Sequence, residues 1–186
     1  MLSISNPARA LSYDAAGNTL SDANGGSAYT AVYNHEGRLA QMTGQGGVVM
    51  TMVYDAQGQR VKQQIGSNPA IYFAYDLQGQ LLGEYTRSGE RFTPLIEYIW
   101  LEGQPVAAVR PTPGAPASAG NSAQEVFYLH TDHLGAPRVA LDQAGRVRWR
   151  WMGGEPCGVS PAETNPSGLG DLNISLRLPG QRYDGF

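Results

Sequence analysis

The chain has 186 residues, 41% of them hydrophobic, which is enough for one sizeable core and gives no reason to expect two domains. Charged residues make up only 16%, and the formal net charge of -3 offers no basic surface for nucleic acid. Cys157 is the single cysteine, so a disulfide within the chain is excluded. The 24 glycines and 12 prolines are typical of many strands joined by tight turns.

No stretch of the sequence approaches the roughly 20 consecutive apolar residues that a membrane-spanning helix needs. The first residues contain no basic leader followed by a long apolar run. We therefore expect a soluble, β-rich protein that has no membrane span and no ordinary signal peptide.

Four closely related six-residue motifs occur in the first half of the chain. Their tyrosines are 20, 21 and 21 residues apart, which identifies an internal repeat. A fifth, degenerate copy has leucine in place of tyrosine and lies beyond the regular array. The motifs are YDAAGN (13–18), YNHEGR (33–38), YDAQGQ (54–59), YDLQGQ (75–80) and, as the degenerate copy, LDQAGR (141–146).

Each position of the motif has a task in a tight turn. The tyrosine ends the incoming strand, where its ring packs on the sheet and its hydroxyl can reach a polar partner. Asp or Asn accepts a hydrogen bond from the backbone N–H two residues on, and glycine adopts the positive φ that closes a type I turn into a bulged hairpin. We assign these roles to Tyr13, Asp14 and Gly17, to Tyr33, Asn34 and Gly37, to Tyr54, Asp55 and Gly58, and to Tyr75, Asp76 and Gly79.

A period of about 21 residues has room for two short strands and two turns. Each repeat does contain a second segment rich in turn-forming residues, such as 43–47 and 66–70. The segments between turns, such as 48–54 and 71–75, are rich in β-branched, aromatic or alternating residues. We therefore predict an all-β fold, an antiparallel meander of hairpins that forms a curved, spiralling sheet with little or no helix.

Strand patterns continue beyond the array. Residues 91–110 predict a longer hairpin, and residues 111–124 are rich in Pro, Ala, Gly and Ser, which predicts a flexible excursion. Further strands are expected between 125 and 152, followed by a mostly looped segment with one late strand near 173–178. We divide the chain into a hairpin array (1–109), a flexible loop (110–125) and a final region (126–186), all of them part of one continuous sheet.

The order of the motifs resembles that of the bacterial Rhs, or YD-repeat, proteins. The repeats are followed by EYIWLEGQPVA (97–107), then YLHTDHLGAPRVALDQAGRVRWRW (128–151), and finally LRLPGQRYD (176–184). The chain is similar to the C-terminal part of the repeat shell of that family, where it leads into the repeat-associated core region. The signature block contributes His130, Asp132, His133, Gly135, Pro137 and Arg138.

The resemblance implies a shell of spiralling repeats that encloses a C-terminal toxin, in bacterial proteins secreted or displayed by a specialised system. It implies no cofactor and a role that is structural, with the rest of the shell or a toxin segment as partner. The aspartyl cleavage motif and toxin of complete members do not occur in this sequence, so no catalytic residue is carried over. Cys157 stands where the resembling proteins lead us to expect an aromatic residue.

The sequence HTDH offers the most tempting alternative. Imidazole and carboxylate are zinc ligands, and in a strand His130 and Asp132 share a face while His133 points away. We favour a structural turn in which Asp132 bonds to backbone amides. A Cys157 nucleophile paired with His130 or His133 would need a cationic neighbour to activate the thiolate, and the nearby Glu155 does not provide one.

In the run RVRWRW (146–151), alternation predicts Val147, Trp149 and Trp151 on one face of a strand and the arginines on a solvated or lumen face. The alternative is that Trp149 and Trp151 face a ligand such as a sugar ring. Besides a shell segment, the sequence is therefore compatible with a carbohydrate- or protein-binding module at a bacterial surface and, third, with a metal-dependent or cysteine enzyme. Because a short array of hairpins cannot close a shell, we also expect open strand edges that favour self-association.

Overall fold

The structure is a computed structural model that describes residues 2–5, 8–23, 28–115, 123–153 and 160–184. The described residues form an antiparallel β-meander that does not close on itself, which confirms the predicted all-β fold class. Within them the helical content is one 3₁₀ turn at Gln45–Gly47, and no helix is long and apolar enough to cross a membrane. The chain divides into two compact units, Met1–Phe73 and Ala74–Gly185.

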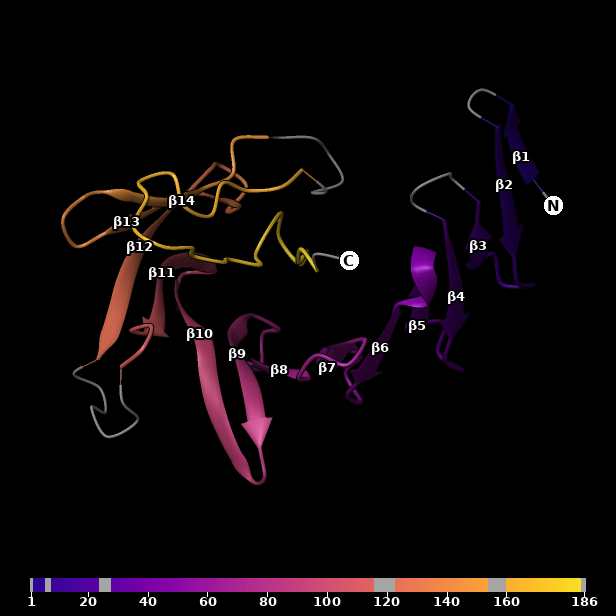
Figure 1. The fold of residues 1–186 in the computed structure, drawn as a ribbon, viewed down its shortest axis with the longest axis horizontal. Coiled ribbons are helices and arrows are strands. Elements are labelled where there is room, and N and C mark those ends of the chain that lie inside the picture. The colour runs from indigo at the N-terminus through magenta and orange to yellow at the C-terminus, as the bar shows by residue number, and fades with distance from the viewer. Residues whose placement is uncertain (1, 6–7, 24–27, 116–122, 154–159, 185–186) are drawn as a thin grey trace. The chain divides into compact units, whose positions relative to one another are not determined.

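The first unit is a series of short strands, each antiparallel to the next. Alternation sets its core: in the strand VMTMVY, Met50 and Met52 are buried while Thr51 and Val53 are exposed. Figure 1 shows these strands following one another in chain order. They are β1 (Leu2–Ser5), β2 (Ala8–Tyr13), β3 (Thr19–Asp22), β4 (Tyr29–Tyr33), β5 (Leu39–Gly44), β6 (Val49–Tyr54), β7 (Arg60–Ile65) and β8 (Ile71–Tyr75), which extends over the boundary.

The second unit has longer strands and the larger core. Its strands are β9 (Leu81–Ser88), β10 (Arg91–Leu101), β11 (Gln104–Pro111), β12 (Gln124–Thr131), β13 (Pro137–Asp142) and β14 (Val147–Arg150). β11 and β12 thus take up both ends of the predicted flexible loop, of which residues 116–122 lie outside the described part. Phe127 on β12 and Trp149 on β14 are fully buried on the inner face.

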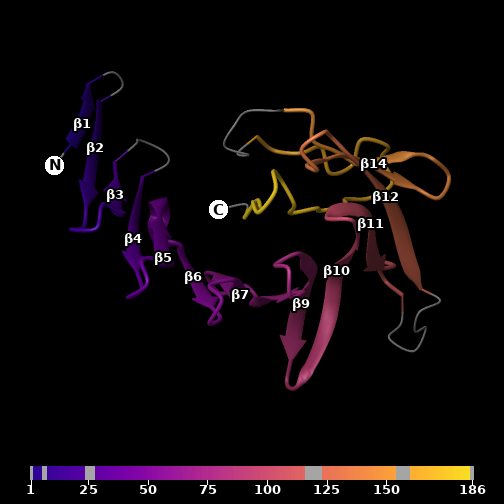
Figure 2. The same cartoon turned by 180° about the vertical axis from the view of Figure 1, so that it is seen from behind.

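The inner face of this second sheet is covered by the chain's own carboxy-terminal segment, residues 160–184. Figures 1 and 2 show this segment, in yellow, passing β10 and β11 in both views. Leu172 and Ile174 are buried there, and the backbone N–H of Ser175 lies 3.4 Å from the hydroxyl of Tyr98 on β10. The segment therefore completes a core that the strands alone would leave open.

The sequence predicted a strand near 173–178, and this prediction is wrong. The segment is extended but forms only one isolated bridge, between Leu176 and Arg182. A turn through Pro179 follows immediately, in which the N–H of Arg177 bonds to the carbonyl of Gln181 at 3.2 Å. The chain therefore reverses before a ladder can develop, and side-chain anchors hold the segment in place.

Candidate functional site

The YD motif folds into a hairpin turn whose carboxylate is enclosed by backbone N–H groups. In the first copy, the carbonyl of Asp14 accepts from the N–H of Gly17 at 3.2 Å, and the N–H of Asp14 donates to the carbonyl of Asn18 at 3.0 Å. Oδ1 of Asp14 accepts from the N–H groups of Ala16 (2.9 Å) and Asn18 (2.8 Å). Gly17 has φ of 88°, which only glycine adopts without strain. The turn is therefore fixed by hydrogen bonds among four of the motif's own residues.

These hydrogen bonds also fix the charge state of the carboxylate. The side-chain amide of Asn18, followed by its backbone N–H, lowers the pKa of Asp14 from its ordinary value of 3.8. The side-chain amide reaches Oδ2 at 2.8 Å. An ionised carboxylate engaged on both oxygens stabilises a turn and is poorly suited to act as a general base.

The same turn occurs six times among the described residues. In each copy the Asp or Asn N–H bonds to the carbonyl four residues on, the glycine N–H bonds back to its carbonyl, and Oδ1 accepts from the N–H four residues on. The first residues of these turns are Asp14, Asn34, Asp55, Asp76, Asp132 and Asp142.

Two of these copies extend the array beyond its regular part. The degenerate motif at 141–146 forms the same turn, and so does TDHLGA at 131–136 inside the signature block. Sequence reasoning expected a turn at Asp132 but did not recognise it as a repeat, because Thr131 replaces the tyrosine. The available signal was the Asp132-to-Gly135 spacing, which equals that of the other copies.

The aromatic residue at the end of a strand links its repeat to the turn of the preceding one. In each case a side-chain donor reaches the main-chain carbonyl five residues after the Asp or Asn of that turn. A tryptophan performs this task in the second unit, which the sequence did not indicate. The pairs are Tyr33 Oη with Thr19 O (3.1 Å), Tyr54 Oη with Leu39 O (2.9 Å) and Trp100 Nε1 with Leu81 O (2.8 Å).

The signature block joins its turn through Arg138 to Trp151, the residue that follows β14. Nε of Arg138 donates to Oδ2 of Asp132 at 2.9 Å, and the guanidinium lies 4.6 Å from the ring centroid of Trp151. Burial of Asp132 raises the pKa of its carboxyl, but the hydrogen bonds from Arg138, Ala136 and Leu134 outweigh it, so the pKa lies below 3.8. Asp132 is thus engaged by the turn and by an ion pair.

The two signature histidines do not converge with Asp132 on a common site. His130 and His133 are both exposed, while both oxygens of Asp132 are engaged as above. Within the described ranges no group of three His, Cys, Asp or Glu side chains is arranged to hold a metal ion. Cys157 lies outside the described residues, so the proposed pairing of its thiol with a histidine has no structural description.

Trp149 and Trp151 do not face a ligand site. Both side chains are fully buried, and Nε1 of Trp151 donates to the carbonyl and the hydroxyl of Ser160 at 3.0 and 2.8 Å. The ligand-facing alternative is therefore wrong for this structure, because the carboxy-terminal segment covers both indoles. The expectation of a solvated arginine face is also wrong at one position, since Arg148 is only 4% exposed.

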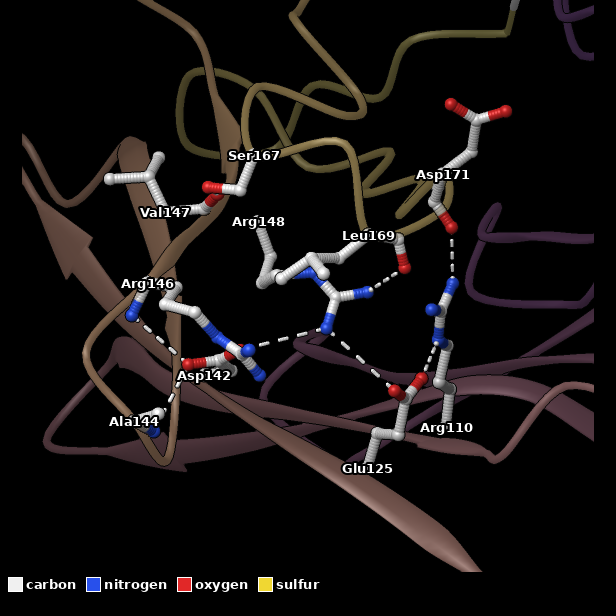
Figure 3. A network of polar contacts seen from close by, with 10 residues as sticks. All are labelled: Arg110, Glu125, Asp142, Ala144, Arg146, Val147, Arg148, Ser167, Leu169 and Asp171. Carbon is white, nitrogen blue, oxygen red and sulfur yellow. Dashed lines mark hydrogen bonds and ion pairs between the residues drawn. The ribbon is translucent and has the colours of Figure 1, made fainter.

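Arg148 on β14 lies at the centre of a network of charges that ties four strands to the carboxy-terminal segment (Figure 3). Its Nη1 lies 3.7 Å from Oε1 of Glu125 on β12 and 3.7 Å from Oδ2 of Asp142 at the end of β13. Its Nη2 donates to the carbonyl of Leu169 at 3.0 Å. Arg110 on β11 pairs with the other oxygen of Glu125 at 2.8 Å. Glu125 is thus shared by two arginines, Arg110 and Arg148.

The outer ends of this network are also attached to backbone (Figure 3). Arg110 donates to the carbonyl of Asp171, and Arg146 pairs with Asp142 at 2.9 Å. Burial raises the pKa of Asp142, but the backbone and side-chain hydrogen bonds of Arg146 and the N–H of Ala144 lower it below 3.8 overall. Both carboxylates of the network are therefore held by hydrogen bonds to cations.

A second buried polar cluster joins β9, β10 and the carboxy-terminal segment. The hydroxyl of Ser175 donates to Glu84, and the hydroxyl of Tyr98 lies 3.4 Å from the same carboxylate oxygen. Burial, and then the charge of Glu84, raise the pKa of Tyr98 strongly. The phenol therefore stays protonated, as a buried hydrogen-bonding group.

These contacts define the class of protein: an all-β repeat protein whose recurring acidic residues hold turns and strand junctions together. No family model matches the chain, and no curated protein matches it. Among solved structures, it is similar to a chain of TcdB2-TccC3-TEV, with 17% identity and a TM-score of 0.47 over 76% of this chain and 8% of that one.

Two further structures are similar over comparable lengths. One is TcdB2-TccC3 without its hypervariable C-terminal region, with 16% identity and a TM-score of 0.46 over 77% of this chain and 9% of that one. The other is the Photorhabdus luminescens Tc holotoxin pore with a TccC3 mutation, with 18% identity and a TM-score of 0.42 over 77% of this chain and 9% of that one. The chain thus spans less than a tenth of the length of each of these three proteins.

Proposed function

We propose that the chain is a structural segment of an Rhs-type shell, which helps to enclose a C-terminal toxin polypeptide and is not itself catalytic. The observation that carries the proposal is the repeated turn together with the link from the strand-end aromatic residues Tyr33, Tyr54 and Trp100 to the turn before each of them. Such a module can be added repeatedly to a growing sheet without any change in its chemistry. The order of the sequence motifs supports the same function.

The proposed partners are the remaining part of the shell or a toxin segment, in a protein secreted by bacteria or displayed on their surface for competition. Open strand edges are the expected attachment points. In the described part of the chain, β1 has β2 as its one neighbour, whereas the outer side of β14 is partly occupied through the Arg150–Glu163 bridge. An added strand, from a shell segment or a second copy, would therefore meet less competition at β1.

Co-expression tests this proposal. The tagged 186-residue chain is produced together with a C-terminal toxin segment of an Rhs-type protein, and with an unrelated folded protein of the same size as a control. We expect the toxin segment alone to co-purify and to become resistant to trypsin. Loss of both effects, with the chain still folded by circular dichroism, contradicts the proposal.

The binding-module alternative makes a different prediction. A carbohydrate- or protein-binding module would retain its ligand in the absence of any toxin segment. Because Trp149 and Trp151 are buried, no aromatic platform at those positions favours sugar binding. An enzyme would need an activity that disappears in His130→Ala or Cys157→Ala. A glycan array on the unmodified chain tests the binding module, and an activity screen on the two variants tests the enzyme.

A further inference from the structure

A cavity of about 360 Å³ lies where the carboxy-terminal segment covers the inner face of the second sheet. Glu84 on β9 and Trp149 on β14 line it from the sheet. Residues of the segment, among them Ile174 and Tyr183, line it from the other side. The charged residues of the lining are Glu84, Arg177 and Asp184. The cavity thus combines apolar and aromatic walls with charges of both signs.

Glu84 brings a carboxylate to this cavity without a cationic partner. The residue is only 7% exposed. Oε1 accepts from the hydroxyl of Ser175 and lies 3.4 Å from the hydroxyl of Tyr98, but no cation in the described part of the chain lies within ion-pair distance of the carboxylate. Oε2 makes no hydrogen bond to a described residue, and it is not one of the unpartnered atoms that are closed to solvent. Its remaining exposure is therefore open to the cavity that Glu84 lines.

Arg177 brings a guanidinium to the same cavity, and the residue is only 4% exposed. Nη1 donates to the carbonyls of Ile174 and Leu176, both at 2.9 Å. The guanidinium lies 5.7 and 4.7 Å from the ring centroids of Trp149 and Tyr183, both of which line the cavity. Nε is closed to solvent, whereas Nη2 makes no hydrogen bond to a described residue and is not among the closed atoms. Nη2 is therefore the donor that remains open to the cavity.

Both of these charges are energetically costly as they stand. A buried charge is normally paired, because burial removes its hydration without supplying a substitute. Burial accordingly lowers the pKa of Arg177 from its ordinary value, and Tyr183 and Tyr98 oppose this only in part. Asp184, the third charged residue of the lining, pairs with Arg182 at 3.5 Å. The other two charges are therefore left for a ligand.

A molecule that carries both charges satisfies both groups at once. Its ammonium donates to Oε2 of Glu84, and its carboxylate accepts from Nη2 of Arg177. An aliphatic side chain then contacts Trp149 and Ile174. We propose that this cavity binds an amino-acid zwitterion with an apolar side chain, supplied either by a free amino acid or by the two ends of a dipeptide. A ligand with one charge alone would leave the opposite charge of the cavity unpaired. The inference goes beyond the shell function and does not depend on it, because it rests on the groups of the cavity alone.

Leucine and its two blocked forms test the proposal on the full 186-residue chain. L-leucine, N-acetyl-L-leucine and L-leucinamide are titrated at pH 6, where a free α-amino group is protonated, and binding is followed by calorimetry. We expect saturable binding of leucine and an affinity about tenfold or more lower for each blocked form, because each leaves one charge of the cavity without its partner. Binding of either blocked form as tight as that of leucine overturns the proposal.

A dipeptide distinguishes the two sources of the zwitterion. Glycyl-L-leucine carries the same two charges as leucine but holds them farther apart. Tighter binding of the dipeptide identifies the ends of a short peptide as the preferred occupant, and tighter binding of leucine identifies a free amino acid. Failure of both compounds to bind overturns the proposal.

The indole N–H signals in the NMR spectrum show where the ligand binds. Trp149 lines the cavity, whereas Trp100 does not. We expect bound leucine to shift the indole signal of Trp149 and to leave that of Trp100 in place. A shift confined to Trp100 contradicts the assignment.

A matched pair of variants tests the role of the carboxylate. Glu84→Gln removes the charge but keeps an oxygen for the hydroxyls of Ser175 and Tyr98. Glu97→Gln makes the same change on β10, where the carboxylate accepts from the hydroxyl of Tyr85 at 2.8 Å and does not line the cavity. We expect Glu84→Gln to weaken leucine binding about tenfold or more and Glu97→Gln to leave it unchanged, with folding of both verified by circular dichroism. Equal effects in the two folded variants overturn the proposal.

Discussion

The hydroxyl of Tyr54 donates a hydrogen bond to the main-chain carbonyl of Leu39 across 15 residues, at 2.9 Å. Tyr54 ends β6, and Leu39 begins β5, directly after the preceding turn. The bond therefore connects two successive repeats at a carbonyl next to the turn. In this repeat the bond uses the polar tip of the tyrosine, which an apolar side chain would not supply.

The first prediction concerns this bond. Tyr54→Phe removes the hydroxyl but keeps the ring, so we expect a loss of about 1 kcal/mol in the free energy of unfolding. Tyr13→Phe is the matched control, because Tyr13 has the same place in the first motif and its hydroxyl makes no hydrogen bond to a described residue. Urea denaturation followed by circular dichroism measures both. Equal losses in the two variants would show that the inter-repeat bond contributes nothing specific.

The second prediction concerns the glycine of the turn. Gly58 and Gly17 have similar φ values of 80° and 88°, so alanine at either position costs about 1 kcal/mol in backbone strain. At Gly58 an added Cβ would also lie 1.8 Å from Nη2 of Arg38, whereas Gly17 has no neighbour within 4 Å. Arg38 can move, but it then leaves the ring of Tyr54, whose centroid is 5.8 Å from its guanidinium. We expect Gly58→Ala to be the more destabilising change.

A double-mutant cycle isolates the contribution of Arg38. In an Arg38→Ala background, Gly58→Ala should lose its excess cost and behave like Gly17→Ala. The free energies of unfolding from urea titrations provide the four corners of the cycle. An excess that persists without the arginine side chain contradicts the proposed steric cause.

The third prediction concerns acid sensitivity at Asp132. Its pKa is lowered in the folded state, so below about 4 the unfolded chain binds more protons and stability is lost as the pH falls through the folded pKa. Asp132→Asn retains an oxygen for the two backbone N–H groups, as Asn34 does naturally, but removes the ion pair with Arg138. We expect the variant to be less stable than the wild type at pH 7 and the difference to shrink below pH 4. Urea denaturation at pH 7 and pH 3 measures it, and an unchanged difference contradicts the argument.

The turns were predictable from the sequence because their physics is local. Asp14 and Gly17 are three residues apart, and their hydrogen bonds lie within the turn itself, so composition and spacing are sufficient to identify them. Residues 48–54 were likewise expected to form a strand, and the structure places β6 there, with Met50 and Met52 on its buried face. The signature-block turn was expected for the same reason, although its membership of the repeat became visible only in the backbone hydrogen bonds.

The burial of the arginines was not predictable because it depends on a distant segment. Arg148 alternates with Trp149 along β14 and was therefore expected at a solvated or lumen face, but Leu169 and its neighbours fold back over it. Arg177 becomes a buried residue and Ser175 a half-buried one for the same reason, since the sequence pattern of a looped segment does not indicate which face it will cover. The cavity beside Arg177 follows from this long-range packing.

The last prediction concerns Glu125, the carboxylate that Arg110 and Arg148 share in the network of Figure 3. Removal of Arg148 leaves Glu125 paired with Arg110 and leaves Asp142 paired with Arg146, so no carboxylate is left without a cation. Its own Nε is buried without a partner. We therefore expect Arg148→Met to change the free energy of unfolding by no more than about 1 kcal/mol, because a buried ion pair contributes little compared with an apolar side chain of similar volume.

Removal of Glu125 has the opposite consequence. Glu125→Gln leaves the buried guanidinium of Arg148 and the largely buried one of Arg110, 5% and 13% exposed, without their common charge partner. We expect a loss of about 2 kcal/mol, below the range for a fully buried pair because Glu125 is itself 27% exposed. Arg150→Met is the control on the same strand, and loss of its solvent-screened pair with Glu163 should cost clearly less than Glu125→Gln. Urea denaturation of the three variants orders them, and a greater loss in Arg148→Met than in Glu125→Gln contradicts the central role of the shared carboxylate.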